Sequence, residues 1–360
     1  MRRLGHTRVR VYESVRTAHL ERAHRLTPAA IVHRGRRYDF DEDLAEGLEL
    51  VQASRWGAAR LVAGSDVTEL EVNEPLMLPA LPTTVLVLAL LGIRRRRVRV
   101  VTYAIGNADP FRMPPRRGVR RRLRARLDLA LARFVWRRLD RVAFGTDQAR
   151  SVYEDVLGPP RAESTLIPAL PARSDDVPTA PRGPGVAFVG AFTERKGLPQ
   201  LVEAWPLVTQ AVPQARLVLV GKGELEDVAR ALADRDPSVE LVVDPPRDEI
   251  RRQLAASRVL VLASQPTPAW REQVGLPIVE GLEQGCRVVA TTETGLAPWL
   301  ERHGHGVVGV PTRPGALAAA IVEQLRGADD PAAVLATLPE RDGRLEADRW
   351  LFAPAAKEAR

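Results

Sequence analysis

The sequence predicts an α/β protein built from doubly wound parallel sheets. Short apolar runs, typical of buried parallel strands, alternate with stretches of helical periodicity along most of its 360 residues. That length exceeds one ordinary domain, and residues 171–185 are rich in proline, glycine and polar side chains without periodicity. We therefore expect two domains with a sheet in each, joined by a linker within this segment.

The first half contains seven candidate strands, each followed by a loop or a helical pattern, and we expect it to form an N-terminal domain over residues 1–172. Residues 116–139 give the clearest helix, in which Leu123, Leu127 and Leu131 share an apolar stripe and arginines fill much of the other surface. This stripe should lie against the domain while the arginines stay in water. The candidate strands are residues 9–12, 30–33, 49–52, 70–72, 98–103, 142–145 and 165–167.

The alternation is sharper in the second half, where a linker at residues 173–184 precedes an expected C-terminal domain over residues 185–328. A terminal segment, residues 329–360, follows it. Strand, helix and strand succeed one another here as they do in a doubly wound sheet. The candidate strands are residues 186–189, 216–220, 239–243, 259–263 and 287–291, with helices at 198–210 and 247–256, one ending by 232, and one beginning near Pro277.

Composition excludes several classes of protein. The only cysteine, Cys286, can form neither a disulfide within the chain nor a thiolate metal cluster, which fits a reducing cytoplasm; it opens a candidate strand, where we expect it to be buried. The longest apolar run, residues 85–91, is too short to span a bilayer, and the N-terminus lacks an export pattern. The histidines lack ligand spacing, and we interpret the acidic triplets at 39–43 and 234–236 as solvated. We therefore expect a cytoplasmic protein without a metal or cofactor.

The stretch EQVGLPIVEGLEQG, residues 272–285, carries the main chemical signal. Glu272 and Glu280 stand eight positions apart, and Pro277 suits the first turn of a helix that follows a buried strand. The crevice between such a strand end and a helix N-terminus suits an anion. Carboxylates beside it accept hydrogen bonds from a vicinal diol, as the acidic residue of dinucleotide folds does with ribose.

This stretch resembles the E-x7-E signature of the family 4 retaining glycosyltransferases, which have the GT-B fold. The matching residues are Glu272, Gly275, Leu276, Pro277 and Glu280, with Val274 where the family usually has phenylalanine. The resemblance implies two Rossmann-like domains that face each other across a cleft, with the terminal segment returning to the first domain through Trp350, Leu351 and Phe352. It also implies transfer of a hexose from a nucleotide-sugar donor to an acceptor, with retention of configuration and without a metal. In the family the first glutamate approaches the hexose and the second holds the ribose.

A second element is the loop GAFTERKG, residues 190–197, between a candidate strand and a helix. Its amides and Lys196 should converge on the same crevice, where a lysine suits a diphosphate. The resembling family has G-R-L-x-x-x-K-G here, so Gly190 and Lys196 match while Ala191 replaces the arginine. Arg195 is one possible substitute, and a cation from the acceptor domain is another. We take Glu272 and Lys196 as the catalytic candidates.

The remaining candidates lie in loops after other strands. For the donor these are Val243, at a strand end where the family touches the base through its backbone, and Thr294 and Gly295, in a turn similar to the family's glycine-rich one. For the acceptor, strand-end position favours polar side chains of the N-terminal domain, although an ordinary loop or capping role remains the alternative. The family's early glycine pair is missing and Ala104 stands near the position of its histidine. The acceptor candidates are Asn73, Glu74, Asn107 and Asp109.

Charge is concentrated in one region. The net charge is +8, whereas residues Arg94–Arg141 alone contain 17 arginines and three aspartates. Such a patch suits an anionic membrane surface that presents a lipid-linked acceptor, or simply keeps a helix soluble. Nucleic acid is disfavoured because few aromatic side chains accompany the arginines. The acceptor class stays open among glycans, lipid-linked substrates and small molecules. Other readings are a catalytically weak partner subunit, which Ala191 favours, and a sugar-nucleotide epimerase, which the G-L-P context opposes.

Overall fold

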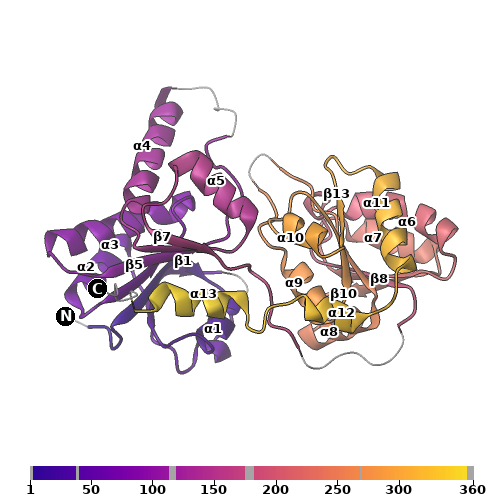
Figure 1. Ribbon diagram of the computed structural model, residues 1–360, viewed down its shortest axis with the longest axis horizontal. Coiled ribbons are helices and arrows are strands. Elements are labelled where there is room, and N and C mark those ends of the chain that lie inside the picture. The colour runs from indigo at the N-terminus through magenta and orange to yellow at the C-terminus, as the bar shows by residue number, and fades with distance from the viewer. Residues whose placement is uncertain (1–2, 38–39, 113–118, 175–181, 268–269, 355–360) are drawn as a thin grey trace, which may run out of the picture. The chain divides into compact units, whose positions relative to one another are not determined.

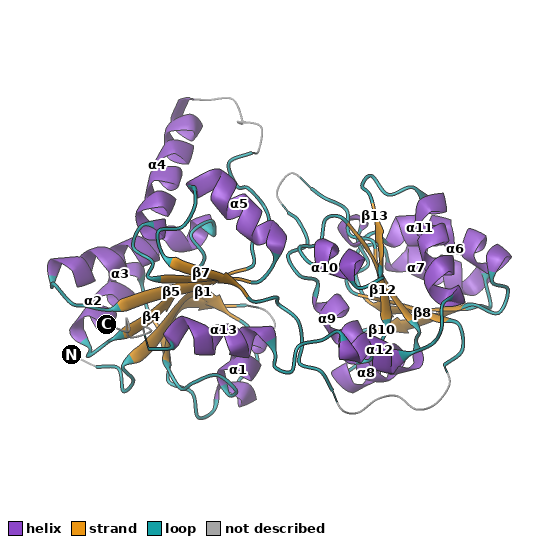
Figure 2. Cartoon of the chain, viewed as in Figure 1, coloured by secondary structure: helices purple, strands orange, loops and turns teal. Residues whose placement is uncertain are grey.

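The chain folds into two compact units, each with one parallel sheet and helices on its faces (Figure 2). The computed structural model describes residues 3–37, 40–112, 119–174, 182–267 and 270–354. Unit 1 comprises Met1–Gly145, Ala149–Pro168 and Arg344–Arg360, and unit 2 comprises Thr146–Gln148 and Ala169–Gly343. The expected α/β class with doubly wound sheets is confirmed.

Unit 1 contains a seven-stranded sheet in the order β3-β2-β1-β4-β5-β6-β7, in which every neighbouring pair is parallel. The order reverses beside β1, where Val9 lies opposite Ala30 of β2 on one side and Leu70 of β4 on the other. This reversal is the topological switch point, where open α/β sheets bind ligands. The strands, all seven of them predicted, are β1 Arg8–Val15, β2 Ala30–Arg36, β3 Leu50–Gln52, β4 Glu69–Val72, β5 Arg99–Ala104, β6 Arg141–Phe144 and β7 Glu163–Leu166.

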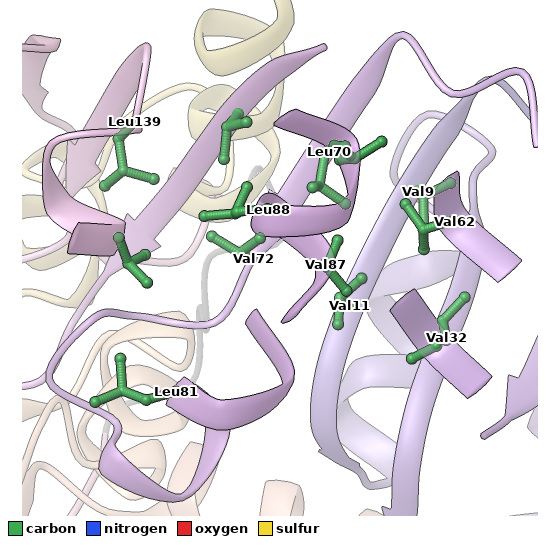
Figure 3. Packing of buried hydrophobic residues seen from close by; sticks show 14 of the residues in the cluster. Val9, Val11, Val32, Val62, Leu70, Val72, Leu81, Val87, Leu88 and Leu139 are labelled. Carbon is green, nitrogen blue, oxygen red and sulfur yellow. The ribbon is translucent and has the colours of Figure 1, made fainter. Parts of the chain in front are cut away.

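One face of this sheet carries the main core of unit 1. Alternate side chains of β1 and β4, such as Val9, Val11 and Leu70, meet apolar side chains of the covering helices, such as Val62 and Val87 (Figure 3). Within the described ranges no helix is both long enough and apolar enough to cross a membrane. The helices are α1 Thr17–Ala23, η1 Asp43–Ala45, α2 Arg55–Gly64, η2 Leu78–Ala80, α3 Leu81–Ile93, α4 Val119–Trp136, α5 Asp147–Leu157 and α13 Gly343–Phe352.

The apolar stripe of α4 is buried only toward its C-terminal end. Leu123 and Leu127 are 67% and 53% exposed, so the prediction that they lie against the domain is wrong. Ala132 and Val135 are fully buried. The physical reason is length: α3, which packs beside α4, has 13 residues against 18 in α4, and at about 1.5 Å per residue α4 extends beyond its neighbour. The first residues of the predicted helix, 116–118, lie outside the described residues.

The other face of the unit 1 sheet is covered in part by α13 (Figure 1). Leu351 and Phe352 pack there against Val101 and Ala143, and the Arg8 guanidinium lies 3.9 Å from the centre of the Phe352 ring. The terminal segment is thus divided: α12 belongs to unit 2, and the chain from residue 344 onward belongs to unit 1.

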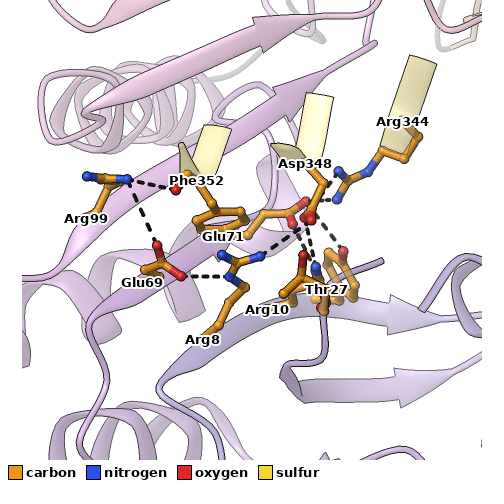
Figure 4. A network of polar contacts seen from close by, with 10 residues as sticks. Arg8, Arg10, Thr27, Glu69, Glu71, Arg99, Arg344, Asp348 and Phe352 are labelled. Atoms are coloured by element: carbon orange, nitrogen blue, oxygen red, sulfur yellow. Dashed lines mark hydrogen bonds and ion pairs between the residues drawn. The ribbon is translucent and has the colours of Figure 1, made fainter. Parts of the chain in front are cut away.

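A buried ionic network ties α13 to the sheet (Figure 4). Arg10 of β1 donates to Glu71 of β4 at 3.1 Å and to Asp348 of α13 at 2.8 Å. Arg344 of α13 donates to the other oxygen of Glu71. These four side chains are all less than 10% exposed. Burial alone would raise the pKa of Glu71, but the guanidiniums of Arg344 and Arg10 hold it below its ordinary value.

Unit 2 contains a six-stranded parallel sheet in the order β10-β9-β8-β11-β12-β13, so its switch point lies between β8 and β11. Cys286 is buried just before β12, and burial raises the pKa of its thiol to about 12, as expected for a core residue. The strands are β8 Gly185–Val189, β9 Arg216–Gly221, β10 Val239–Val243, β11 Val259–Leu262, β12 Arg287–Thr291 and β13 Gly306–Val308. The helices are η3 Glu194–Lys196, α6 Leu198–Ala211, α7 Glu226–Arg235, α8 Arg247–Ala256, α9 Leu276–Glu283, α10 Ala297–Arg302, α11 Pro314–Arg326 and α12 Pro331–Ala336.

Candidate active site

The candidate site lies at the switch point of unit 2, where β8 and β11 end side by side. The loop after β8 reaches the end of β11 through Gly197, which adopts a φ of +79°. A Cβ at this position would stand 1.9 Å from the carbonyl oxygen of Ala263. Only glycine therefore permits this approach, and the approach brings Lys196 to the segment that carries Glu272.

Lys196 and Glu272 form an ion pair with an Nζ to Oε2 distance of 2.5 Å. The Ser264 hydroxyl donates to the same carboxylate oxygen at 2.9 Å, and the Thr291 hydroxyl donates to the Ser264 carbonyl at 2.6 Å. Glu272 is only 7% exposed. Two partners from different loops thus fix this carboxylate, which makes it a preorganised group rather than a solvated one.

The helix α9 begins beside this pair, one residue later than Gly275. Gly275 is the N-cap residue with a φ of +81°, and no side chain caps the helix. Leu276 is 51% exposed, whereas Pro277 is buried in the first turn. No side chain therefore neutralises the partial positive charge of this helix end, although the Ile278 N–H already donates to the Gly275 carbonyl at 2.9 Å. Anion binding at this end stays a prediction.

Glu280 lies one turn further along α9, with a side chain that is 20% exposed. Arg247, the first residue of α8, places its Nη2 3.4 Å from Glu280 Oε1. Val243, the last residue of β10, is 40% exposed. Lys222, which follows β9, pairs with Asp244 at 2.7 Å. Sequence reasoning missed Arg247 and Lys222, although both follow candidate strands and the strand-end rule points to such residues.

The turn after β12 supports the motif loop from behind. The Thr294 hydroxyl donates to the Val274 carbonyl at 3.0 Å, and the Gly295 N–H donates to the Gln273 carbonyl at 2.8 Å. A Cβ on Gly295 would stand 2.3 Å from that same oxygen. These contacts hold the segment between the two glutamates in place, so Thr294 and Gly295 position the loop whatever else they touch.

In unit 1, Asn73 and Glu74 at the end of β4 have internal partners. Asn73 Oδ1 accepts from the Glu13 N–H at 2.7 Å. Glu74 Oε2 accepts from the N–H groups of residues 105 and 106 at 3.0 and 2.8 Å, and from the Tyr153 hydroxyl at 3.1 Å. Burial raises the pKa of Glu74, and these hydrogen bonds oppose that rise. Both side chains join neighbouring strand-end loops.

Asn107 and Asp109 lie in the loop after β5. Asn107 is 1% exposed, and Asp109 Oδ1 accepts from the Phe111 N–H at 2.8 Å, as a turn residue does. All four acceptor candidates therefore lie at the carboxyl edge of the unit 1 sheet. Their role in acceptor binding stays a prediction.

The comparisons with known proteins agree with this geometry. Residues 183–326 match a family model described as glycosyl transferases group 1. The match covers most of unit 2 and less than half of the chain. The amylovoran biosynthesis glycosyltransferase AmsK of Erwinia amylovora is 30% identical over 150 residues, which cover 40% of this chain and 37% of AmsK. The lipopolysaccharide core biosynthesis glycosyltransferase LpsE of Rhizobium meliloti is 35% identical over 122 residues, 34% of this chain and 33% of LpsE. The matches thus span about a third of the length of each relative.

Solved structures extend the likeness in fold to nearly the whole chain. WaaG, a glycosyltransferase involved in lipopolysaccharide biosynthesis, aligns with a TM-score of 0.62 and 15% identity over 96% of this chain and 100% of WaaG. HepE of Anabaena, solved in complex with UDP, aligns with a TM-score of 0.65 and 15% identity over 96% of this chain and 95% of HepE. The glycosyltransferase group 1 segment therefore lies in a chain with the GT-B fold that the motif implied.

Proposed function

We propose that this chain is a glycosyltransferase that moves a hexose from a nucleotide-sugar to an acceptor, with unit 2 binding the donor. The observation that carries the proposal is the Lys196–Glu272 contact of 2.5 Å at the switch point of a glycosyl transferases group 1 segment. Glu280 lies in α9 of the same motif, and we assign it to accept the ribose hydroxyls. The structure of HepE in complex with UDP makes UDP the first nucleotide to test.

In the proposed reaction the bond between the anomeric carbon and the diphosphate oxygen breaks as a bond to the acceptor oxygen forms on the same face, so configuration is retained. The acceptor proton passes to the departing phosphate, and a nucleoside diphosphate leaves. Negative charge therefore grows on the phosphate. We assign the stabilisation of that charge to Lys196 and to the positive end of the α9 dipole, and the approach to the hexose to Glu272.

We also propose that the reaction needs neither a metal nor a cofactor beyond the donor itself. The support is the set of positive groups at the strand ends, namely the Lys196 and Lys222 ammonium groups, arginine side chains and a helix N-terminus, which can neutralise a diphosphate as a divalent ion would. Within the described residues no three histidine, cysteine or acidic side chains gather in a geometry that suits a metal ion. Full transfer activity in the presence of excess chelator is the expected result.

The test is a thermal-shift panel with UDP, GDP, ADP, dTDP and their hexose derivatives. A ligand at a hundredfold excess over its Kd adds about 2.7 kcal/mol of stability. We expect Glu280→Gln to weaken donor binding through the ribose and Lys196→Ala to slow turnover. Glu283→Gln is the matched control, because Glu283 is an exposed carboxylate on the same helix. Normal binding and turnover in both site variants would contradict the assignment, and binding without transfer would favour a catalytically weak partner subunit.

We propose further that unit 1 binds an anionic membrane surface through the region Arg94–Arg141. The first half of α4 exposes arginines on several sides together with Leu123 and Leu127, and Ile93 at the end of α3 is 77% exposed. Charge attracts such a surface to anionic headgroups, and exposed leucines can then enter the acyl boundary. A lipid-linked acceptor would be presented at the same place.

Vesicle flotation tests this second proposal. We expect the protein to float with vesicles that contain anionic lipid and to remain below with pure phosphatidylcholine. Replacing Leu123 and Leu127 by serine should reduce flotation while leaving the charge unchanged. Flotation by an arginine-depleted variant equal to that of the parent, or binding of RNA but not of vesicles, would eliminate the membrane role.

A further inference from the structure

Two cationic side chains of the β8 loop share one aromatic ring. The Arg195 guanidinium carbon lies 4.6 Å from the centre of the Trp270 ring, and Lys196 Nζ lies 5.3 Å from it. Both distances fall within the roughly 6 Å range of cation–π attraction. The Arg195 carbonyl also accepts from the Gln265 N–H at 2.9 Å, so the β8 loop and the segment after β11 are held together by main chain as well.

The two cations differ in how their charge is compensated. Lys196 is paired with Glu272, and nearby Arg271 and Arg247 are paired with Glu293 and Glu280 at 3.4 Å each. By contrast, among the residues that the structure describes, no carboxylate oxygen lies within 4.0 Å of the Arg195 guanidinium nitrogens. Its partner is the Trp270 ring. The Trp270 contact therefore orders a guanidinium without neutralising it.

An uncompensated charge is needed at this place. A bound diphosphate carries more than one negative charge, whereas the Lys196 ammonium already faces a carboxylate. The position that would supply a second cation from the start of the loop is Ala191, which has none. A guanidinium suits the task because its fork of N–H donors matches phosphate oxygens.

We infer that Arg195 supplies the second positive charge for the donor diphosphate and that Trp270 is the positioning residue that holds it. Trp270 acts through Arg195 and does not itself contact the reacting atoms. The inference rests on the proposed function of this site as a nucleotide-sugar site. It assigns roles to Trp270, outside the glutamate motif, and to Arg195, two residues before the glycine that closes the loop.

The experiment measures calorimetric affinities for UDP, GDP, ADP and dTDP, each compared with its monophosphate. We expect Arg195→Ala and Trp270→Ala each to weaken binding of the preferred diphosphate about tenfold, close to the upper range of a partly desolvated cation–π contact. Monophosphate affinity should change less than threefold. Trp270→Phe keeps a ring and should retain most of the affinity. Arg230→Ala is the control, because Arg230 is an exposed unit 2 arginine paired within α7.

The double variant decides whether Trp270 acts through Arg195. If it does, the losses of the two single variants do not multiply in the double variant, because only the contact of the ring with Lys196 remains to be lost. Multiplied losses in the double variant would overturn the positioning role. Unchanged diphosphate affinity in Arg195→Ala would overturn the assignment of Arg195. If the parent protein binds no nucleoside diphosphate, the proposed function itself is refuted. Failure of the proposed function is thus distinguishable from failure of the Arg195 assignment.

Discussion

The buried ionic network of unit 1 makes a quantitative prediction for Glu71→Gln. In the parent protein two guanidiniums, Arg10 and Arg344, face two carboxylates, Glu71 and Asp348, at sites less than 10% exposed. The glutamine keeps the size of the side chain but removes one negative charge. The network then holds one uncompensated positive charge, and neither guanidinium can reach water to be solvated.

The size of the effect follows from that burial. Removing one partner of a buried ion pair costs about 3–5 kcal/mol because the other charge stays buried. For a unit of this size each kcal/mol shifts the Tm by about 2–4 °C, so the transition of unit 1 should fall by roughly 6–20 °C. Glu69→Gln is the matched control on the same strand: the Glu69 side chain is 23% exposed and pairs with Arg8 at 2.7 Å. Arg8 keeps a second carboxylate, Asp348, at 3.5 Å, so the loss of Glu69 leaves its charge partly compensated and should cost less.

Calorimetry is the appropriate assay, since the two units need not unfold together. A drop in one transition for Glu71→Gln, with the other unchanged, is the expected pattern. Equal Tm values for Glu71→Gln and Glu69→Gln would refute the reasoning, because they would mean that water or a local rearrangement solvates the network. Replacing Arg10, Glu71, Arg344 and Asp348 together by apolar side chains of similar volume should cost far less than the single change.

Three further predictions concern titration and backbone geometry. Burial, Arg287 and His303 lower the pKa of His305 to about 3, and its Nδ1 accepts the Val288 N–H at 3.2 Å, so the folded protein holds it neutral. The free energy of unfolding should therefore fall as pH drops from about 6.5 toward 3, by at most about 1.4 kcal/mol per pH unit. In His305→Asn the free energy of unfolding, measured with urea at each pH, should depend less steeply on pH. The raised pKa of Glu74 has the opposite sign: its stabilising contribution is complete below about pH 4.5 and is lost as pH rises through the folded pKa, so the stability of Glu74→Gln relative to the parent should rise as pH increases above about 4.5. Gly197→Ala should lower both Tm and donor affinity because its Cβ would meet the Ala263 carbonyl at 1.9 Å, whereas Gly315→Ala, which meets nothing within 4 Å, should leave both intact.

The unit 2 site could be predicted from the sequence because its residues follow a local rule. Glu272, Pro277 and Glu280 lie within nine residues, and Lys196 follows a strand that had to lie in the same sheet. In a parallel sheet the carboxyl ends of all strands meet at one edge, so residues after different strands converge there without any knowledge of their contacts. The Lys196–Glu272 pair is the outcome of that convergence.

Other features depend on contacts that no local pattern encodes. Arg10 and Asp348 are 338 residues apart, and which carboxylate meets which guanidinium depends on how α13 lies on the sheet. The charges at every second position, Arg8 and Arg10 in β1, do indicate a polar strand face, but not what covers it. The prediction that the first turns of α4 are buried failed for a similar reason. Periodicity identifies the face of a helix that can be buried, while the length of its neighbour decides how much of it is.

The first six strands of unit 1 and the six strands of unit 2 follow the same order, and the two units use its switch point in different ways. In unit 2 the loops at β8 and β11 approach through glycine, and the Arg195 guanidinium lies 4.6 Å from the centre of the Trp270 ring. In unit 1 the corresponding side chains, Asn73 and Glu74, accept hydrogen bonds from the backbone of neighbouring loops. Polar groups that are already paired fix the shape of a rim but offer little charge to a ligand, whereas an unneutralised cation attracts a phosphate. The Arg195 charge, which has no carboxylate partner among the described residues, therefore supports the proposal that unit 2 binds the donor.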